Sequence, residues 1–84
     1  SLKHEMTKAK ICYLLTQMNV YFLTEAIFST GGRADILTER GEIIEVLHSE
    51  DEKKFDEKVS VYPEGLNIIK VKTPEDLDEY LMEV

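Results

Sequence analysis

The sequence is poor in the residues that mark several classes of protein. It has a single cysteine, Cys12, and therefore no internal disulfide, which favours a reducing, cytoplasmic setting. It has no tryptophan, only two prolines, and no apolar run long enough to span a membrane. The first residues also lack the charged-then-apolar order of a signal peptide. These absences exclude a disulfide-stabilised scaffold and predict that a membrane is not a partner.

Basic residues are scarce as well. Ten lysines and arginines stand against 17 aspartates and glutamates, which gives a net charge of −7. Binding to nucleic acid through its phosphates needs clustered positive charge, so this balance counts against a non-specific nucleic-acid binder. Acids that bind a metal add negative charge only until the cation arrives. The net charge alone therefore does not exclude an enzyme that acts on DNA.

The chain does contain enough apolar sequence for one domain. Its 84 residues, 43% of them hydrophobic, predict a single globular domain over residues 1–84 with one core. A domain of this size gains stability when it associates, so we expect a homodimer.

Hydrophobic spacing divides the first half of the chain into a helix and three strands. Strand-forming residues predict strands over residues 20–28, about 33–38, and 42 to about 48. Apolar residues three and four positions apart predict an amphipathic helix over residues 2–18. Its expected stripe is Leu2, Met6, Ala9 and Tyr13, with Ile11, Leu14, Leu15 and Met18 beside them.

The second half predicts two further helices around a fourth strand. Ser49 and Glu52 have the spacing of a capping box, and the helix after them ends before Pro63. A strand follows over residues 66–71, and Thr73 begins a final helix. The buried residues expected of the two helices are Phe55, Val59 and Tyr62, then Leu77, Tyr80, Leu81 and Val84. This order predicts an α/β fold on a mixed sheet.

Two acids, Asp35 and Glu45, interrupt the apolar pattern of neighbouring strands. An unpaired carboxylate is costly to bury, so the pair suggests a metal site or an ion-pair network. A two-residue loop between the strands would put the acids on opposite faces of the sheet. A three-residue loop over residues 39–41, with Gly41 in a left-handed conformation, pairs Asp35 directly with Glu45. We predict the three-residue loop.

This register predicts which side chains share a face of the sheet. Opposed side chains lie roughly 5 Å apart at Cβ, so two carboxylates there repel unless a cation lies between them. Mg²⁺ or Mn²⁺ prefers such oxygen ligands. The residues expected on one face are Asp35, Leu37, Ile43, Glu45 and Leu47, and those on the other are Ala34, Ile36, Ile44 and Val46.

The run from Gly31 to Ile36, followed by residues 42–46 and set in this order of helices and strands, resembles the PD-(D/E)XK nuclease superfamily. It is most similar to small archaeal Holliday-junction resolvases and related restriction-type endonucleases. The resemblance implies a restriction-endonuclease-like αβββαβ core with a mixed four-stranded sheet flanked by helices, here with an added C-terminal helix. It also implies a Mg²⁺-dependent endonuclease that hydrolyses phosphodiester bonds in double-stranded or branched DNA.

The same resemblance implies roles for individual residues. Asp35 and Glu45 match the acids that bind the metal, and Glu5 and Glu25 are weaker candidates for a further ligand. The family carries a lysine two positions after the second acid, where this chain has Leu47.

A lysine on the following helix replaces the motif lysine in some members. Lys58 is the first candidate for this displaced catalytic lysine and Lys54 is the second. A purely structural interpretation competes with this role for both lysines, because their spacing is also typical of a charged helix face with intrahelical ion pairs.

We expect a nuclease, but two other functions stay open. The first is a catalytically inactive module of the same fold, acting as a dimeric nucleic-acid-binding or protein-interaction domain; Leu47 and the net charge favour it. The second is an unrelated structural or regulatory domain, in which the acids are solvated or paired with Arg33. That alternative would be supported if the third strand were out of register and Asp35 and Glu45 pointed to opposite faces.

Overall fold

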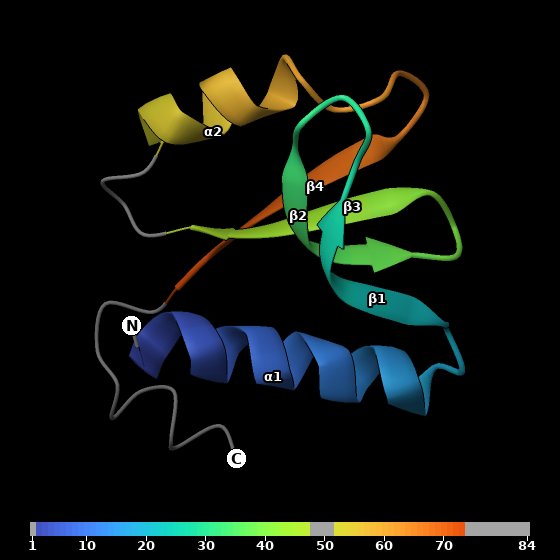
Figure 1. Cartoon of the computed structure of the whole chain (residues 1–84). Coiled ribbons are helices and arrows are strands. Elements are labelled where there is room, and N and C mark those ends of the chain that lie inside the picture. Colours follow the sequence, from blue (N-terminus) through green and yellow to red (C-terminus); the bar gives the residue numbers. More distant parts are fainter. Residues whose placement is uncertain (1, 48–51, 74–84) are drawn as a thin grey trace.

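The computed structural model describes residues 2–47 and 52–73, with the backbone alone for residues 52–54 and 58 (Figure 1). Neither described helix is long and apolar enough to cross a membrane. The predicted cap at Ser49 and the final helix after Thr73 lie outside the described residues. The elements are α1 Leu2–Gln17, β1 Phe22–Ile27, β2 Arg33–Thr38, β3 Glu42–Leu47, α2 Glu52–Val59 and β4 Asn67–Lys72.

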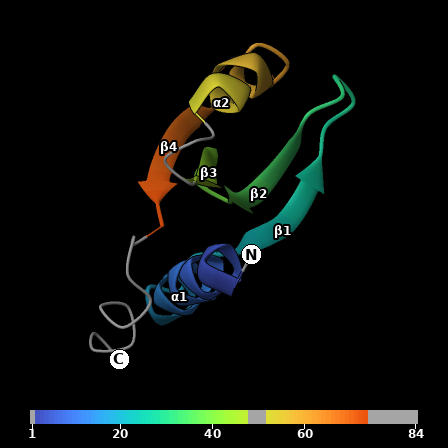
Figure 2. The same ribbon diagram turned by 90° about the vertical axis from the view of Figure 1, so that its left-hand side faces the viewer.

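The four strands form one mixed sheet in the order β1-β2-β3-β4. β1 and β3 each run antiparallel to β2, and β4 runs parallel to β3. A parallel neighbour needs a crossover connection, and α2 lies within it. The two helices lie on opposite sides of the sheet (Figure 2). The predicted α/β class, with a mixed four-stranded sheet and helices on both sides, is confirmed.

The loop between β2 and β3 sets the register of the site. The paired residues are Ile36 with Ile44 and Leu37 with Ile43. Gly41 adopts a left-handed φ of 77°, and its N–H donates to the Thr38 carbonyl at 3.1 Å. This confirms the three-residue loop over residues 39–41. The same register, continued along both strands, sets Asp35 opposite Glu45.

Two apolar clusters, one on each side of the sheet, form the core. The cluster under α1 consists of Leu15, Val20, Ile36 and Ile44, with Ile11, Cys12, Phe22, Ile69 and Val71 packed against it. The cluster on the α2 side consists of Ala34, Ile43 and Tyr62, with Ala26, Phe28, Leu37, Leu66 and Ile68 packed against it. The sheet is therefore covered on both faces around its centre.

The alternation of faces breaks in the middle of β2. Ala34 and Ile36 are two residues apart and should share a face, but they pack in different clusters. The expectation that they lie together was wrong. Glu25 explains the change, because it takes a left-handed φ of 54° opposite this point and the β1–β2 pairing omits it. The break falls at Asp35. Its carboxylate contacts His4 of α1, whereas Leu37 and Ile43 pack on the α2 side and Glu45 contacts Tyr62 there, so the predicted common face does not hold for Asp35.

The buried face of α1 also differs from the predicted stripe. Leu2 and Tyr13 are each 62% exposed, whereas Leu15 and Lys8 are buried. Apolar residues occur around most of this helix, so their spacing does not select one face. Packing against the sheet determines which face of α1 is buried, and Lys8 rather than Leu2 is turned inward.

The turn before β2 gives a test of this packing. A Cβ built on Gly32 would lie 2.8 Å from two ring atoms of Tyr62, closer than side chains pack. We expect Gly32→Ala to lower the free energy of unfolding by about 1–3 kcal/mol, measured by urea denaturation. Thr30→Ala, at an exposed position of the same turn, should stay within about 0.5 kcal/mol of the parent protein. Equal stability of the two variants would contradict the close Gly32–Tyr62 packing.

Candidate active site

The site forms where β2 and β3 stop exchanging backbone hydrogen bonds. Beyond the Ile36–Ile44 pair the two strands diverge (Figure 1). Each acid then accepts a backbone N–H from the opposite strand. Asp35 Oδ2 accepts from Val46 at 2.8 Å, and Glu45 Oε1 lies 3.4 Å from the Asp35 nitrogen. The two carboxylates thus satisfy donors that a continued ladder would have bonded to carbonyl oxygens.

Glu45 is the more deeply buried acid, with 1% of its surface exposed. The Tyr62 hydroxyl donates a short hydrogen bond to its Oε1 and also lies 3.1 Å from the Arg33 carbonyl oxygen. Burial, this hydrogen bond and the charges of Glu45 and Asp35 raise the pKa of the Tyr62 hydroxyl. Tyr62 is therefore a fixed donor that orients the Glu45 carboxylate.

Asp35 meets the first turn of α1. His4 Nε2 lies 3.4 Å from Asp35 Oδ2, and His4 Nδ1 lies 3.4 Å from Glu5 Oε1. The imidazole thus stands between two carboxylates, and it carries positive charge only when both nitrogens are protonated. Glu5 itself is exposed, with 68% of its side-chain surface accessible. It reaches Asp35 through the histidine.

Glu25 is held by two cations. Lys8 Nζ lies 2.5 Å from Glu25 Oε1, and Arg33 Nε lies 3.1 Å from Glu25 Oε2. The hydrogen bond from Lys8, helped by the charges of Lys8, Arg33 and His4, lowers the pKa of the Glu25 carboxyl against the effect of burial. Burial lowers the pKa of Lys8, but Glu25 and the charges of Glu5 and Asp35 outweigh it and raise that pKa.

Of the four predicted acids, three occupy adjacent positions on β1, β2 and β3. Asp35 and Glu45 lie side by side, and the β1–β2 pairs on either side of Glu25 set that residue opposite Asp35. Glu5 is connected to Asp35 through His4. Leu47 is buried and 6% exposed. The side chains of Lys58 and Lys54 lie outside the described residues.

Sequence reasoning missed three residues that contact the acids: His4, Lys8 and Tyr62. His4 and Lys8 are four positions apart, as are Lys8 and Cys12, which lies against the core. That spacing was the available signal for their shared face. Tyr62 was predicted to be buried but was counted only as an apolar residue. A buried tyrosine hydroxyl requires a partner, and this requirement was the signal for its bond to an acid.

The described residues offer a metal ion few protein ligands. Within residues 2–47 and 52–73, no three His, Cys, Asp or Glu side chains form a group that could hold one. Mg²⁺, however, often takes only one or two carboxylates and completes its shell with water and substrate phosphate. A carboxylate has about four lone-pair positions, so the hydrogen bonds to Asp35 and Glu45 do not exclude coordination. Asp35 and Glu45 are hard oxygen donors of the kind that Mg²⁺ prefers.

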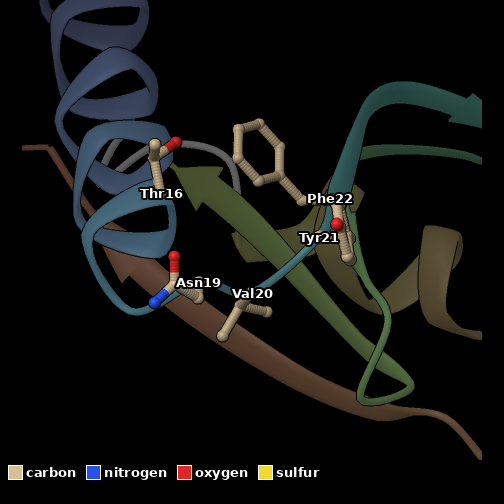
Figure 3. Close-up of a pocket in the computed structure, with 5 residues that line it drawn as sticks. All are labelled: Thr16, Asn19, Val20, Tyr21 and Phe22. Carbon is tan, nitrogen blue, oxygen red and sulfur yellow. The ribbon is translucent and has the colours of Figure 1, made fainter.

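One hollow on the described part of the surface lies away from the acids. A cavity of about 260 Å³ lies between the end of α1 and the start of β1, lined by Thr16, Asn19, Val20, Tyr21 and Phe22 (Figure 3). None of its lining residues is charged. Since the acids contact the first turns of α1 and this cavity adjoins the last, the two features are separate.

No protein-family model matches the chain, and no significant match occurs among curated proteins or among solved structures. The functional argument therefore depends on the residues of this chain and on their geometry.

The bond between Tyr62 and Glu45 can be tested alone. Tyr62→Phe removes the donor to a buried carboxylate and should lower the free energy of unfolding by about 1.5–3 kcal/mol in urea denaturation. Tyr21→Phe makes the same change at a tyrosine that is 81% exposed, and should have almost no effect. A loss below about 0.5 kcal/mol for Tyr62→Phe would show that Glu45 does not depend on this hydroxyl.

Proposed function

We propose that this chain is a metal-dependent endonuclease that hydrolyses phosphodiester bonds in double-stranded or branched DNA. The observation that carries the proposal is the opposition of two buried acids, Asp35 and Glu45, where β2 and β3 diverge. The order of helix, three strands, helix and strand supports it, because it agrees with the αβββαβ core implied by the resemblance to PD-(D/E)XK nucleases.

Asp35 and Glu45 are the residues that would hold the ion. Mg²⁺ or Mn²⁺ bound there would supply activation of water and stabilisation of the charge on the phosphate. The chain itself orients the two ligands, since Val46 N–H fixes Asp35 and Tyr62 fixes Glu45. A ligand set that is oriented before the metal arrives loses little freedom on binding.

The choice of carboxylates also supports a cation site. An amide side chain at either position could accept the same backbone N–H bonds without bringing two negative charges together. The hydrogen bonding between the strands therefore does not by itself require acids at Asp35 and Glu45. A bound cation does require acids at these two positions, because it binds carboxylates more strongly than amide oxygens and removes the repulsion between them.

A second candidate function is an inactive module of the same fold that binds nucleic acid or protein. The position two residues after Glu45 favours it, because Leu47 is buried and has no charge to offer a phosphate. In the nuclease proposal this charge comes from elsewhere, and the sequence predicts Lys58 for it.

The proposal includes a homodimer. Large apolar side chains remain exposed on and just after α1, which supports association through this part of the molecule. These side chains are Leu2, Tyr13, Leu14 and Met18.

A cleavage assay tests the proposal. Linear, single-stranded and branched DNA are incubated with the protein in Mg²⁺, in Mn²⁺ and with a chelator. We expect metal-dependent cleavage that falls at least about 1,000-fold in Asp35→Asn and in Glu45→Gln, because each removes a ligand charge. Both variants keep an oxygen that accepts the backbone N–H, so loss of activity should not reflect loss of the β2–β3 contact.

Glu39→Gln serves as the matched control, since it removes one negative charge at an exposed position of the hairpin loop. It should cleave at the parent rate. Cleavage that persists in Asp35→Asn would come from a contaminant and would refute the proposal. Binding of DNA without cleavage by the parent protein would favour the inactive module.

A further inference from the structure

We propose that Lys8 on α1 is the catalytic lysine of this site and that its ammonium contacts the scissile phosphate in place of the side chain missing at Leu47. This inference rests on the nuclease function proposed above and goes beyond it by naming a residue on a different element from Lys58. The structure carries it through the position of Lys8, its burial and its partners.

Lys8 approaches the acidic residues of the sheet from α1. It is one helical turn after His4, so both side chains leave the same face of α1. His4 reaches Asp35 at 3.4 Å and Lys8 reaches Glu25 at 2.5 Å. Glu25 and Asp35 are opposed on β1 and β2, and Asp35 is opposed in turn to Glu45. The Lys8 ammonium therefore lies on the side of the sheet from which His4 contacts Asp35, one of the two proposed ligands.

Burial of Lys8 also needs an explanation. Lysine is among the residues least often buried, yet only 8% of Lys8 is exposed while Leu2 and Tyr13 on the same helix are 62% exposed. Packing alone would favour the reverse arrangement, because burial of a charge costs free energy and burial of an apolar side chain does not. The observed arrangement places a fixed positive charge next to the acids.

The contacts of Glu25 allow Lys8 to turn to a substrate. Glu25 bonds Lys8 through one carboxylate oxygen and Arg33 through the other. When a phosphodiester binds at Asp35 and Glu45, its negative charge competes with Glu25 for the ammonium, and Arg33 stays with Glu25. Neither carboxylate nor phosphate is then left without a cation.

The test measures single-turnover cleavage together with binding of the same duplex DNA in Ca²⁺. Lys8→Gln keeps a donor for Glu25 but removes the charge, and Lys8→Arg keeps the charge. We expect Lys8→Gln to lower the cleavage rate about 100- to 1,000-fold, with the dissociation constant for DNA changed less than about threefold. Lys8→Arg should retain at least about a tenth of the parent rate. Circular dichroism of each variant checks that it is folded.

Lys10→Gln is the matched control, because it removes the same charge from the same helix on a different face. It should cleave at the parent rate. Equal rates for Lys8→Gln and Lys10→Gln would overturn the role of Lys8 and leave the nuclease proposal standing. A rate for Lys8→Arg as low as that of Lys8→Gln would also overturn it, since the charge would then not be the active property. A parent protein that cleaves no DNA would overturn both proposals.

Discussion

Between β2 and β3, carboxylates replace backbone carbonyl groups as the acceptors of N–H hydrogen bonds, and the site depends on this constraint. Two antiparallel strands cannot separate inside a protein unless their buried polar groups find other partners. Asp35 accepts from Val46, and Glu45 lies within reach of the Asp35 N–H. The strands can therefore diverge at this point without leaving buried donors unpaired, and the divergence exposes the two acids to side chains from both helical layers.

Negative charge at this point determines what the neighbouring elements must supply. Tyr62 comes from the α2 side and donates to Glu45, while His4 and Lys8 come from α1 and face Asp35 and Glu25. A helix that covered this part of the sheet with apolar side chains alone would leave Asp35 without its histidine partner and Glu25 without its lysine partner. This requirement accounts for the face that α1 buries better than its hydrophobic pattern does.

Much of the fold could be predicted because local rules determine it. The left-handed Gly41 set the hairpin register, and strand-forming residues located all four strands within one or two positions. The site could be predicted only in part. The left-handed conformation of Glu25 and the inward orientation of Lys8 both depend on tertiary contacts, which no local sequence pattern predicts. The position of Asp35 opposite Glu45 follows from the register alone, so the sequence was enough to predict it.

The structural role of the acids is compatible with the catalytic role proposed for them, and the geometry gives a reason for combining the two. A hydrogen bond that replaces a ladder bond fixes the carboxylate relative to the backbone, so Asp35 and Glu45 are oriented by the same contacts that hold β2 and β3 together. Such rigid support is what a metal site requires of its ligands. The left-handed backbone at Glu25 fits this view, because a strand residue adopts that conformation only when surrounding contacts stabilise it. Here those contacts are ion pairs with Lys8 and Arg33, which bring positive charge to the acids. Glu25 is thus both the left-handed residue of β1 and the residue that holds Lys8 and Arg33 near the site.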